Sequence, residues 1–193
     1  MPENLQSGTK APTLRFVTEP RTKFDKKEAL EMDSLKDVYI DQLQDLYSAN
    51  KQAAVAVEGL ASAANSQALR RALERGIVGI EDGKQKLEAM IRAADANPDA
   101  EYCKGMDGLV REAKAHALKT EFRDDAVRDA VIITQYQRMA HYAIAGYGCA
   151  EAFAKQLGLT EDAATLHAML DAAYSGDRTM SEIAESSINQ RAA

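Results

Sequence analysis

The stretch LKDVYIDQLQDLYSANKQAAVAVEGLASA, residues 35–63, decides the fold class of this protein. Its apolar residues recur at intervals of three and four, which places them on one face of an α-helix. They are Leu35, Val38, Tyr39, Leu43, Leu46, Tyr47, Ala53, Ala54, Val57 and Leu60. Asp33 or Ser34 can cap the first turn, because their side-chain oxygens accept hydrogen bonds from backbone N–H groups. The stretch therefore predicts one long amphipathic helix that ends near Ala63.

The same helical period continues through most of the remaining chain. Apolar patterns predict further helices over about residues 67–94, 103–119, 124–156 and 160–187. The breaks between them carry residues that start or end helices: Asn65-Ser66, Pro98 and Gly158. No stretch alternates apolar and polar residues as a β-strand would. Four helices of about 25 to 35 residues are typical of helix bundles and exceed the average globular helix.

The lengths of the connections predict how these helices are arranged. The first two long helices are joined by a short turn, and so are the last two, which makes two antiparallel hairpins. The connection between the hairpins carries the short helix near residues 103–119, so it is long enough to run from one end of the bundle to the other. The sequence therefore predicts an all-α, ferritin-like up-down-down-up four-helix bundle with a short crossover helix and an N-terminal extension.

The first part of the chain differs in character from the bundle. Residues 1–32 hold three of the four prolines and show no helical period, so we predict a tail that is disordered or docks on a protein partner. Its isolated apolar residues, the candidates for such docking, are Leu14, Phe16 and Phe24. We assign residues 33–191 to the four-helix bundle.

Composition and charge exclude several classes of function. The net charge of −6, without a basic stripe, argues against a nucleic-acid partner, because binding to a phosphate backbone needs clustered Lys and Arg. No apolar run approaches the ~18 residues of a membrane span, and the N-terminus lacks the apolar core of a secretory signal. We therefore expect no membrane partner and a cytoplasmic location. Cys103 and Cys149 form no CxxC pattern, which fits two free thiols.

Five short strings in the sequence carry a family resemblance. They are Tyr47-Ser48-Ala49-x-Lys51-Gln52, Cys103-x-x-Met106-x-Gly108-Leu109-x-x-Glu112-Ala113, Val127-Arg128-Asp129-Ala130, His141-Tyr142-x-Ile144-Ala145-x-Tyr147-Gly148 and Gln156-Leu157-Gly158. Through them, residues 35–187 resemble the YciE/YciF-type ferritin-like stress proteins of bacteria. The resemblance implies a stress-related setting, a homodimer, and a di-iron or di-manganese site whose carboxylates and imidazoles come from four helices.

The positions at which the resemblance implies metal ligands carry other residues in this chain. These vacated positions are Asn50 in the first helix, Val78 and Glu81 in the second, Ala140 and Ala143 in the third, and Ala173 in the fourth. Because at least four carboxylates are missing, we expect no di-metal cofactor and no metal. The alternative is a rebuilt site for a single iron or manganese ion, for which the candidates are Glu81, His141 and Asp177.

Three glycines lie on one face of the second predicted helix, at Gly76, Gly79 and Gly83. Each glycine costs about 1 kcal/mol relative to alanine inside a helix, so the stripe needs a reason. Either the facing helices approach closely and fill the former metal cavity, or an apolar pocket remains there. We favour close packing because cavities are costly and tend to close. The tyrosines are expected in the core or at a dimer interface, with hydroxyls toward polar partners.

Taken together, these features favour a non-catalytic ferritin-like protein that serves as a structural or interaction module in a stress-related setting, with a degenerate di-metal site. No catalytic residue and no cofactor-binding residue stands out. Two alternatives stay open: a metal-binding protein with a rebuilt site, and a binder of small apolar ligands that uses the vacated cavity.

Overall fold

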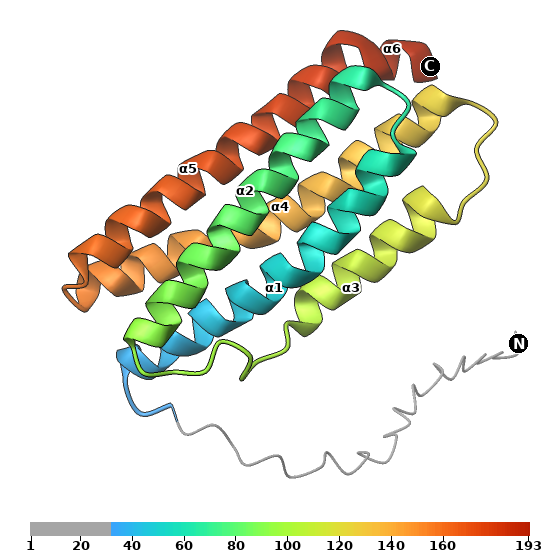
Figure 1. Ribbon diagram of the computed structural model, residues 1–193. Coiled ribbons are helices and arrows are strands. Elements are labelled where there is room, and N and C mark those ends of the chain that lie inside the picture. Colours follow the sequence, from blue (N-terminus) through green and yellow to red (C-terminus); the bar gives the residue numbers. More distant parts are fainter. Residues whose placement is uncertain (1–31) are drawn as a thin grey trace, which may run out of the picture. The chain divides into compact units, whose positions relative to one another are not determined.

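The computed structural model describes residues 32–193, which form a bundle of long helices (Figure 1). The first hairpin consists of α1 (Leu35–Ala63) and α2 (Gln67–Ala93), and the second of α4 (Asp125–Gln156) and α5 (Thr160–Ile183). Between the hairpins, α3 (Lys104–Ala113) continues into a π-helical turn, Lys114–Leu118. After α5, a second π-helical turn, Ala184–Ile188, leads into α6 (Asn189–Ala192).

The chain runs up α1, down α2, back along α3, down α4 and up α5 (Figure 1). This order confirms the predicted ferritin-like up-down-down-up bundle with a short crossover helix. The helix starts and ends fall close to the predicted positions, and residues 32–193 contain no β-strand. The sequence did not reveal that the predicted helices near residues 103–119 and 160–187 change into π-helical turns. The apolar pattern of a single π-helical turn is nearly the same as that of an α-helix. The predicted tail, including Leu14, Phe16 and Phe24, lies outside the described residues.

The start of α1 shows how local sequence sets a helix boundary. The Ser34 hydroxyl oxygen accepts a hydrogen bond from the backbone N–H of Asp37 at 3.2 Å, and Asp37 Oδ2 accepts one from the backbone N–H of Ser34 at 2.9 Å. This reciprocal pair is a capping box, which satisfies two backbone donors that have no partner within the helix. Among the described helices, none is both long enough and apolar enough to span a bilayer.

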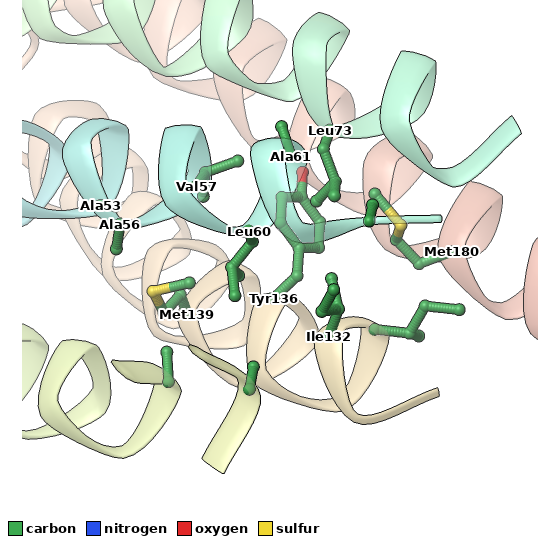
Figure 2. Packing of buried hydrophobic residues seen from close by; sticks show 14 of the residues in the cluster. Ala53, Ala56, Val57, Leu60, Ala61, Leu73, Ile132, Tyr136, Met139 and Met180 are labelled. Carbon is green, nitrogen blue, oxygen red and sulfur yellow. The ribbon is translucent and has the colours of Figure 1, made fainter. Parts of the chain in front are cut away.

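The core consists of two apolar clusters along the length of the bundle. One contains Leu60, Leu73, Ile132, Tyr136, Met139 and Met180, and also packs against α3 (Figure 2). The other contains Tyr39, Leu43, Leu46, Leu87, Ile91 and Leu166. All these side chains are at most 8% exposed, so burial of apolar surface accounts for most of the stability of the fold.

The crossover segment is attached to α1 by hydrogen bonds to the backbone of Cys103. The Ser48 hydroxyl accepts from the Cys103 N–H at 2.9 Å, and the Gln52 side-chain amide donates to the Cys103 carbonyl at 3.0 Å. From α4, the Tyr142 hydroxyl donates to Asp45 Oδ2 at 2.7 Å and lies 3.0 Å from the Cys103 sulfur. These bonds fix the start of α3, so the strings that carried the family resemblance hold the crossover in place.

A buried carboxylate joins the two hairpins at the C-terminal end of α1. Asp129 of α4 is 1% exposed, and its two oxygens accept the backbone N–H groups of Asn65 and Ser66, each at 2.8 Å. Asn65 and Ser66 form the turn between α1 and α2, and the Ser66 side chain also caps α2. Asp129 therefore supplies the partners that this turn lacks within its own hairpin, since buried backbone groups need hydrogen bonds.

We expect the substitution Asp129→Ala to lower the free energy of unfolding by about 3 kcal/mol, because it leaves two backbone donors without their charged acceptor. Chemical denaturation followed by circular dichroism would measure the change. The matched control is Asp125→Ala on the same helix, whose side chain is 68% exposed and which should change stability by no more than about 0.5 kcal/mol. Equal effects of the two substitutions would contradict the role assigned to Asp129.

Candidate functional site

A cavity of about 330 Å³, the central cavity, is lined by residues of all four long helices and by Met106 of α3. Its solvent-exposed lining residues lie on two helices: Arg75, Gly79 and Asp82 on α2, and Ala168, Ala172 and Ser175 on α5. The cavity therefore opens between α2 and α5. Its inner wall consists of side chains of α1 and α4, among them Ala53, Val57, Met139 and Ala143.

The glycine stripe of α2 lines this cavity, which favours the alternative of a pocket over close packing of the facing helices. A Cβ atom added at Gly79 would meet no atom within 4 Å, so the space there is open. At Gly76 an added Cβ would lie 2.9 Å from the Tyr136 hydroxyl, and at Gly83 it would lie 3.1 Å from the Asn50 amide nitrogen, 3.3 Å from the Met169 methyl carbon and 3.4 Å from the Tyr147 hydroxyl. The stripe thus receives side-chain ends from α1, α4 and α5, and the backbones of neighbouring helices do not close over it.

Four of the six predicted vacated positions meet in the central cavity. Asn50 of α1, Ala140 and Ala143 of α4, and Ala173 of α5 all line it. Val78 and Glu81 do not. Val78 is 69% exposed, and Glu81 forms an ion pair with Lys84 of its own helix. Because successive residues of a helix turn by about 100°, the inward positions of α2 belong to the glycine stripe, and Val78 and Glu81 lie on another face of the helix.

Of the three candidates for a rebuilt metal site, His141 and Asp177 lie together, and Glu81 does not join them. His141 is exposed and its Nε2 lies 3.2 Å from Asp177 Oδ1, while Glu81 is paired with Lys84. None of the three lines the central cavity. Within residues 32–193 there is no group of three or more His, Cys, Asp or Glu side chains that could hold a metal ion. The described part of the chain therefore does not assemble the site that these residues were predicted to form.

Asn50 and Tyr147 form a buried polar pair at the inner wall of the cavity. The Asn50 amide donates to the Tyr147 hydroxyl at 2.9 Å, and this hydroxyl lies 3.1 Å from Asn50 Oδ1. The amide also lies 3.5 Å from the Ile80 carbonyl oxygen of α2. Burial raises the pKa of Tyr147 to about 12, although the hydrogen bond with Asn50 acts in the opposite direction. The two side chains satisfy each other, so neither depends on a ligand.

Tyr136 is the polar side chain of the inner wall that sequence reasoning missed. Its ring packs among Leu60, Leu73 and Ile132 (Figure 2), and the residue is 8% exposed. Its hydroxyl lies against Gly76 and Gly176, which both line the cavity. This hydroxyl makes no hydrogen bond to a described residue, in contrast to those of Tyr39, Tyr142 and Tyr147, and it is open to the cavity, since no fully buried side-chain nitrogen or oxygen of residues 32–193 lacks a partner. Burial, and then the charge of Asp177, raise the pKa of Tyr136, so the phenol is neutral and can donate a hydrogen bond.

The lining of the cavity is mostly apolar, with alanine, glycine, aliphatic and methionine residues that contact apolar molecules. Its carboxylate, Asp82, lies at the mouth and pairs with Lys86 at 2.6 Å, and neither an imidazole nor a thiol is among the lining residues. The other polar lining residues are Asn50, Arg75, Tyr136, Tyr147, Ser175 and Thr179.

The chain is similar to known bacterial proteins, among them one of the YciE/YciF type that the sequence resembles. Residues 34–193 match the family described as "Domain of unknown function (DUF892)". Protein YciF of Escherichia coli (strain K12) is 30% identical over 167 residues, which cover 84% of this chain and 98% of the relative. The crystal structure of the E. coli stress protein YciF has a TM-score of 0.76 at 28% identity and covers 82% of this chain and 99% of that one. YcfI of Rhodopseudomonas palustris, at 24% identity and with a TM-score of 0.74, covers 79% and 96% and shows likeness of fold alone.

The raised pKa of Tyr147 predicts a loss of stability in alkaline solution. As the pH rises from the ordinary tyrosine pKa of 10.0 to about 12, the unfolded chain loses this proton while the folded chain keeps it. The free energy of unfolding must therefore fall through this window, because the folded state binds more protons. In the variant Tyr147→Phe the free energy of unfolding should fall less steeply with pH, by up to about 1.4 kcal/mol per pH unit.

Urea denaturation at several pH values would test this expectation. At pH 8, where both states of the wild type are protonated, the same variant should lose about 1–2 kcal/mol, since the buried Asn50 amide then lacks its best partner. An identical pH slope in wild type and variant would show that the Tyr147 proton is held no more tightly in the folded state.

Proposed function

Because this chain belongs to the DUF892 family, we propose that it is a non-catalytic ferritin-like protein that acts as a structural or interaction module in a stress-related setting. The stress-related setting is suggested by the E. coli relative, which is described as a stress protein. One observation carries the non-catalytic part of the proposal. The cavity at the centre of the bundle is lined at four predicted ligand positions by Asn50, Ala140, Ala143 and Ala173.

These four side chains do not suit a di-metal centre. Iron and manganese ions in such bundles are held by carboxylates that project inward from several helices and bridge the two ions. Alanine offers no ligand atom, and the one amide present, that of Asn50, is engaged with Tyr147. The separation of Glu81 from His141 and Asp177 also disfavours the alternative of a rebuilt single-metal site. The vacated cavity therefore supports a degenerate metal site.

A homodimer, a protein partner for the N-terminal tail and a cytoplasmic location belong to the same proposal. Apolar side chains on the outside of the bundle support a protein–protein contact, since large exposed hydrophobic residues favour burial against a partner. Those on the long helices are Val55 of α1, Val78 of α2, Val127 of α4 and Tyr174 of α5, with exposed fractions of 64%, 69%, 38% and 42%.

The metal content of the protein tests the proposal directly. We expect elemental mass spectrometry to find far fewer than one ion per chain, both in untagged protein purified without chelator and after incubation with Fe(II) or Mn(II). The reason is that the four predicted ligand positions in the cavity wall carry no carboxylate. One or two tightly held ions per chain would contradict the proposal, and their loss in Glu81→Ala or His141→Ala would favour the rebuilt site.

A gain-of-ligand variant tests whether the central cavity is the vacated metal site. The triple substitution Asn50→Glu, Ala143→Glu and Ala173→Glu points three carboxylates into one cavity, and we expect it to bind Fe(II) or Mn(II). Metal that binds only the folded state should stabilise it, by about 2.7 kcal/mol at a metal concentration of 100 times Kd. Thermal unfolding with and without metal would measure this gain.

The matched control places the same three carboxylates on the outside of the bundle, as Val55→Glu, Val78→Glu and Tyr174→Glu. It should bind no metal and should show no stabilisation. If the cavity variant folds but behaves as the control does, the four lining positions are not those of a former metal site.

A further inference from the structure

The central cavity has the size of a ligand site and a wall that suits apolar molecules. Its volume of about 330 Å³ falls at the lower end of the range for small-molecule pockets, which is about 300–1,000 Å³. Four methionines line it: Met106 of α3, Met139 of α4, and Met169 and Met180 of α5. Methionine side chains are flexible and polarisable, and they adapt to ligands of different shapes. A small, mostly apolar molecule would therefore find contacts on several sides.

The polar groups of the inner wall differ in whether they have a hydrogen-bond partner within the protein. Asn50 and Tyr147 satisfy each other. Tyr136 is 92% buried, as the complement of its 8% exposure, and its hydroxyl lies beside Gly76 and Gly176 of the cavity wall without a hydrogen bond to residues 32–193. Because no fully buried side-chain nitrogen or oxygen of these residues lacks a partner, this hydroxyl is open to the space of the cavity. A ligand oxygen there would accept its hydrogen bond in place of water.

The charges around the cavity disfavour an anionic ligand. Asp177 lies close enough to Tyr136 for its carboxylate to act on the phenol, and a second negative charge there would be repelled. A charged group would also lose its water inside a wall of methionine and alanine, which is costly unless an opposite charge is present. The cations Arg75 and Lys86 lie at the mouth, on the exposed side of α2, and Lys86 is already paired with Asp82.

We propose that the central cavity binds a small, neutral, mostly apolar molecule whose single oxygen accepts a hydrogen bond from Tyr136. This inference rests on the proposed function, because it requires that no di-metal centre occupies the same cavity.

A pair of fluorinated probes of similar size tests the proposal on the full chain. One is 4-fluoroacetophenone, whose ketone accepts a hydrogen bond, and the other is 1-fluoro-4-isopropylbenzene, in which a methyl group replaces the oxygen. Affinities would be measured by ¹⁹F NMR titration. We expect saturable binding of the ketone, and a loss of roughly fivefold in ketone affinity on Tyr136→Phe, which corresponds to one net hydrogen bond. The affinity for the hydrocarbon should stay unchanged in this variant.

The control Tyr102→Phe removes an exposed hydroxyl that does not line the cavity, and it should bind both probes as the wild type does. No saturable binding of the ketone to the wild type would overturn the proposal. An unchanged ketone affinity in Tyr136→Phe would also overturn it, because the hydrogen bond would then be absent. Tighter binding of 4-fluorobenzoate than of the ketone would overturn the assignment to neutral molecules.

Methionine methyl groups report where the ketone binds. In protein labelled with ¹³C at these methyls, the signals of Met106, Met139, Met169 and Met180 should shift on addition of 4-fluoroacetophenone. Met90 and Met32 do not line the cavity, so their signals should stay in place. Shifts confined to Met32 or Met90 would place the ligand elsewhere and would contradict the proposal.

A side chain added inside the cavity gives a second, independent variant. Gly79→Leu fills open space in the cavity wall and should weaken binding of both probes at least tenfold. Gly108→Leu makes the same change at a glycine of α3 that also has open space and lies outside the cavity, so it should leave binding unchanged. Full binding in Gly79→Leu would exclude the cavity as the site.

The metal measurement on the same samples separates the two hypotheses. Metal-free protein that binds neither probe would overturn the ligand inference and leave the proposed function in place. Protein with stoichiometric metal in the cavity would overturn the proposed function, and the ligand inference with it.

Discussion

The attachment of Cys103 to α1 is the interaction on which the rest of the bundle depends. Two antiparallel hairpins can pack in several relative orientations, and the linker that joins them restricts which of these can form. Ser48 and Gln52 hold the backbone of Cys103, and Tyr142 adds a contact from the second hairpin. The start of α3 is thereby bound to both hairpins, which fixes the direction in which the chain returns and places α4 beside α1.

The two apolar clusters keep the cavity at the centre of the bundle open. The apolar cluster around Leu60 and the cluster around Leu43 pack tightly on either side, and long side chains such as Tyr136 and Met169 extend across the gap between helices. Residues as small as Gly79, Ala143 and Ala172 leave volume that the neighbouring helices do not recover. A close-packed core has low compressibility, so two rigid clusters can keep a cavity between them.

The sequence predicted the fold well and the cavity only in part. Helix boundaries such as the cap at Ser34 depend on neighbouring residues, and these local signals are visible in the sequence. Asn50, Ala140, Ala143 and Ala173 were predicted to share one site because the family strings fix their register, and they do line one cavity. Val78 does not line this cavity, and a shift of one or two residues is enough to change the helix face. The unpartnered hydroxyl of Tyr136 depends on Gly76 and Gly176, which lie on other helices, so no local pattern reveals it.

The bond between Asp129 and Asn65 has a consequence for the order in which the chain folds. Each hairpin consists of neighbouring segments, so it can form from local contacts at little cost in chain entropy. Asp129 and Asn65 are 64 residues apart, and their contact closes a loop that contains α2 and the crossover. Such a closure loses more entropy than a turn does and must follow the collapse of the hairpins. The carboxylate reaches its backbone partners only when both hairpins are in register. Its hydrogen bonds therefore form late in folding and stabilise only the correctly assembled bundle.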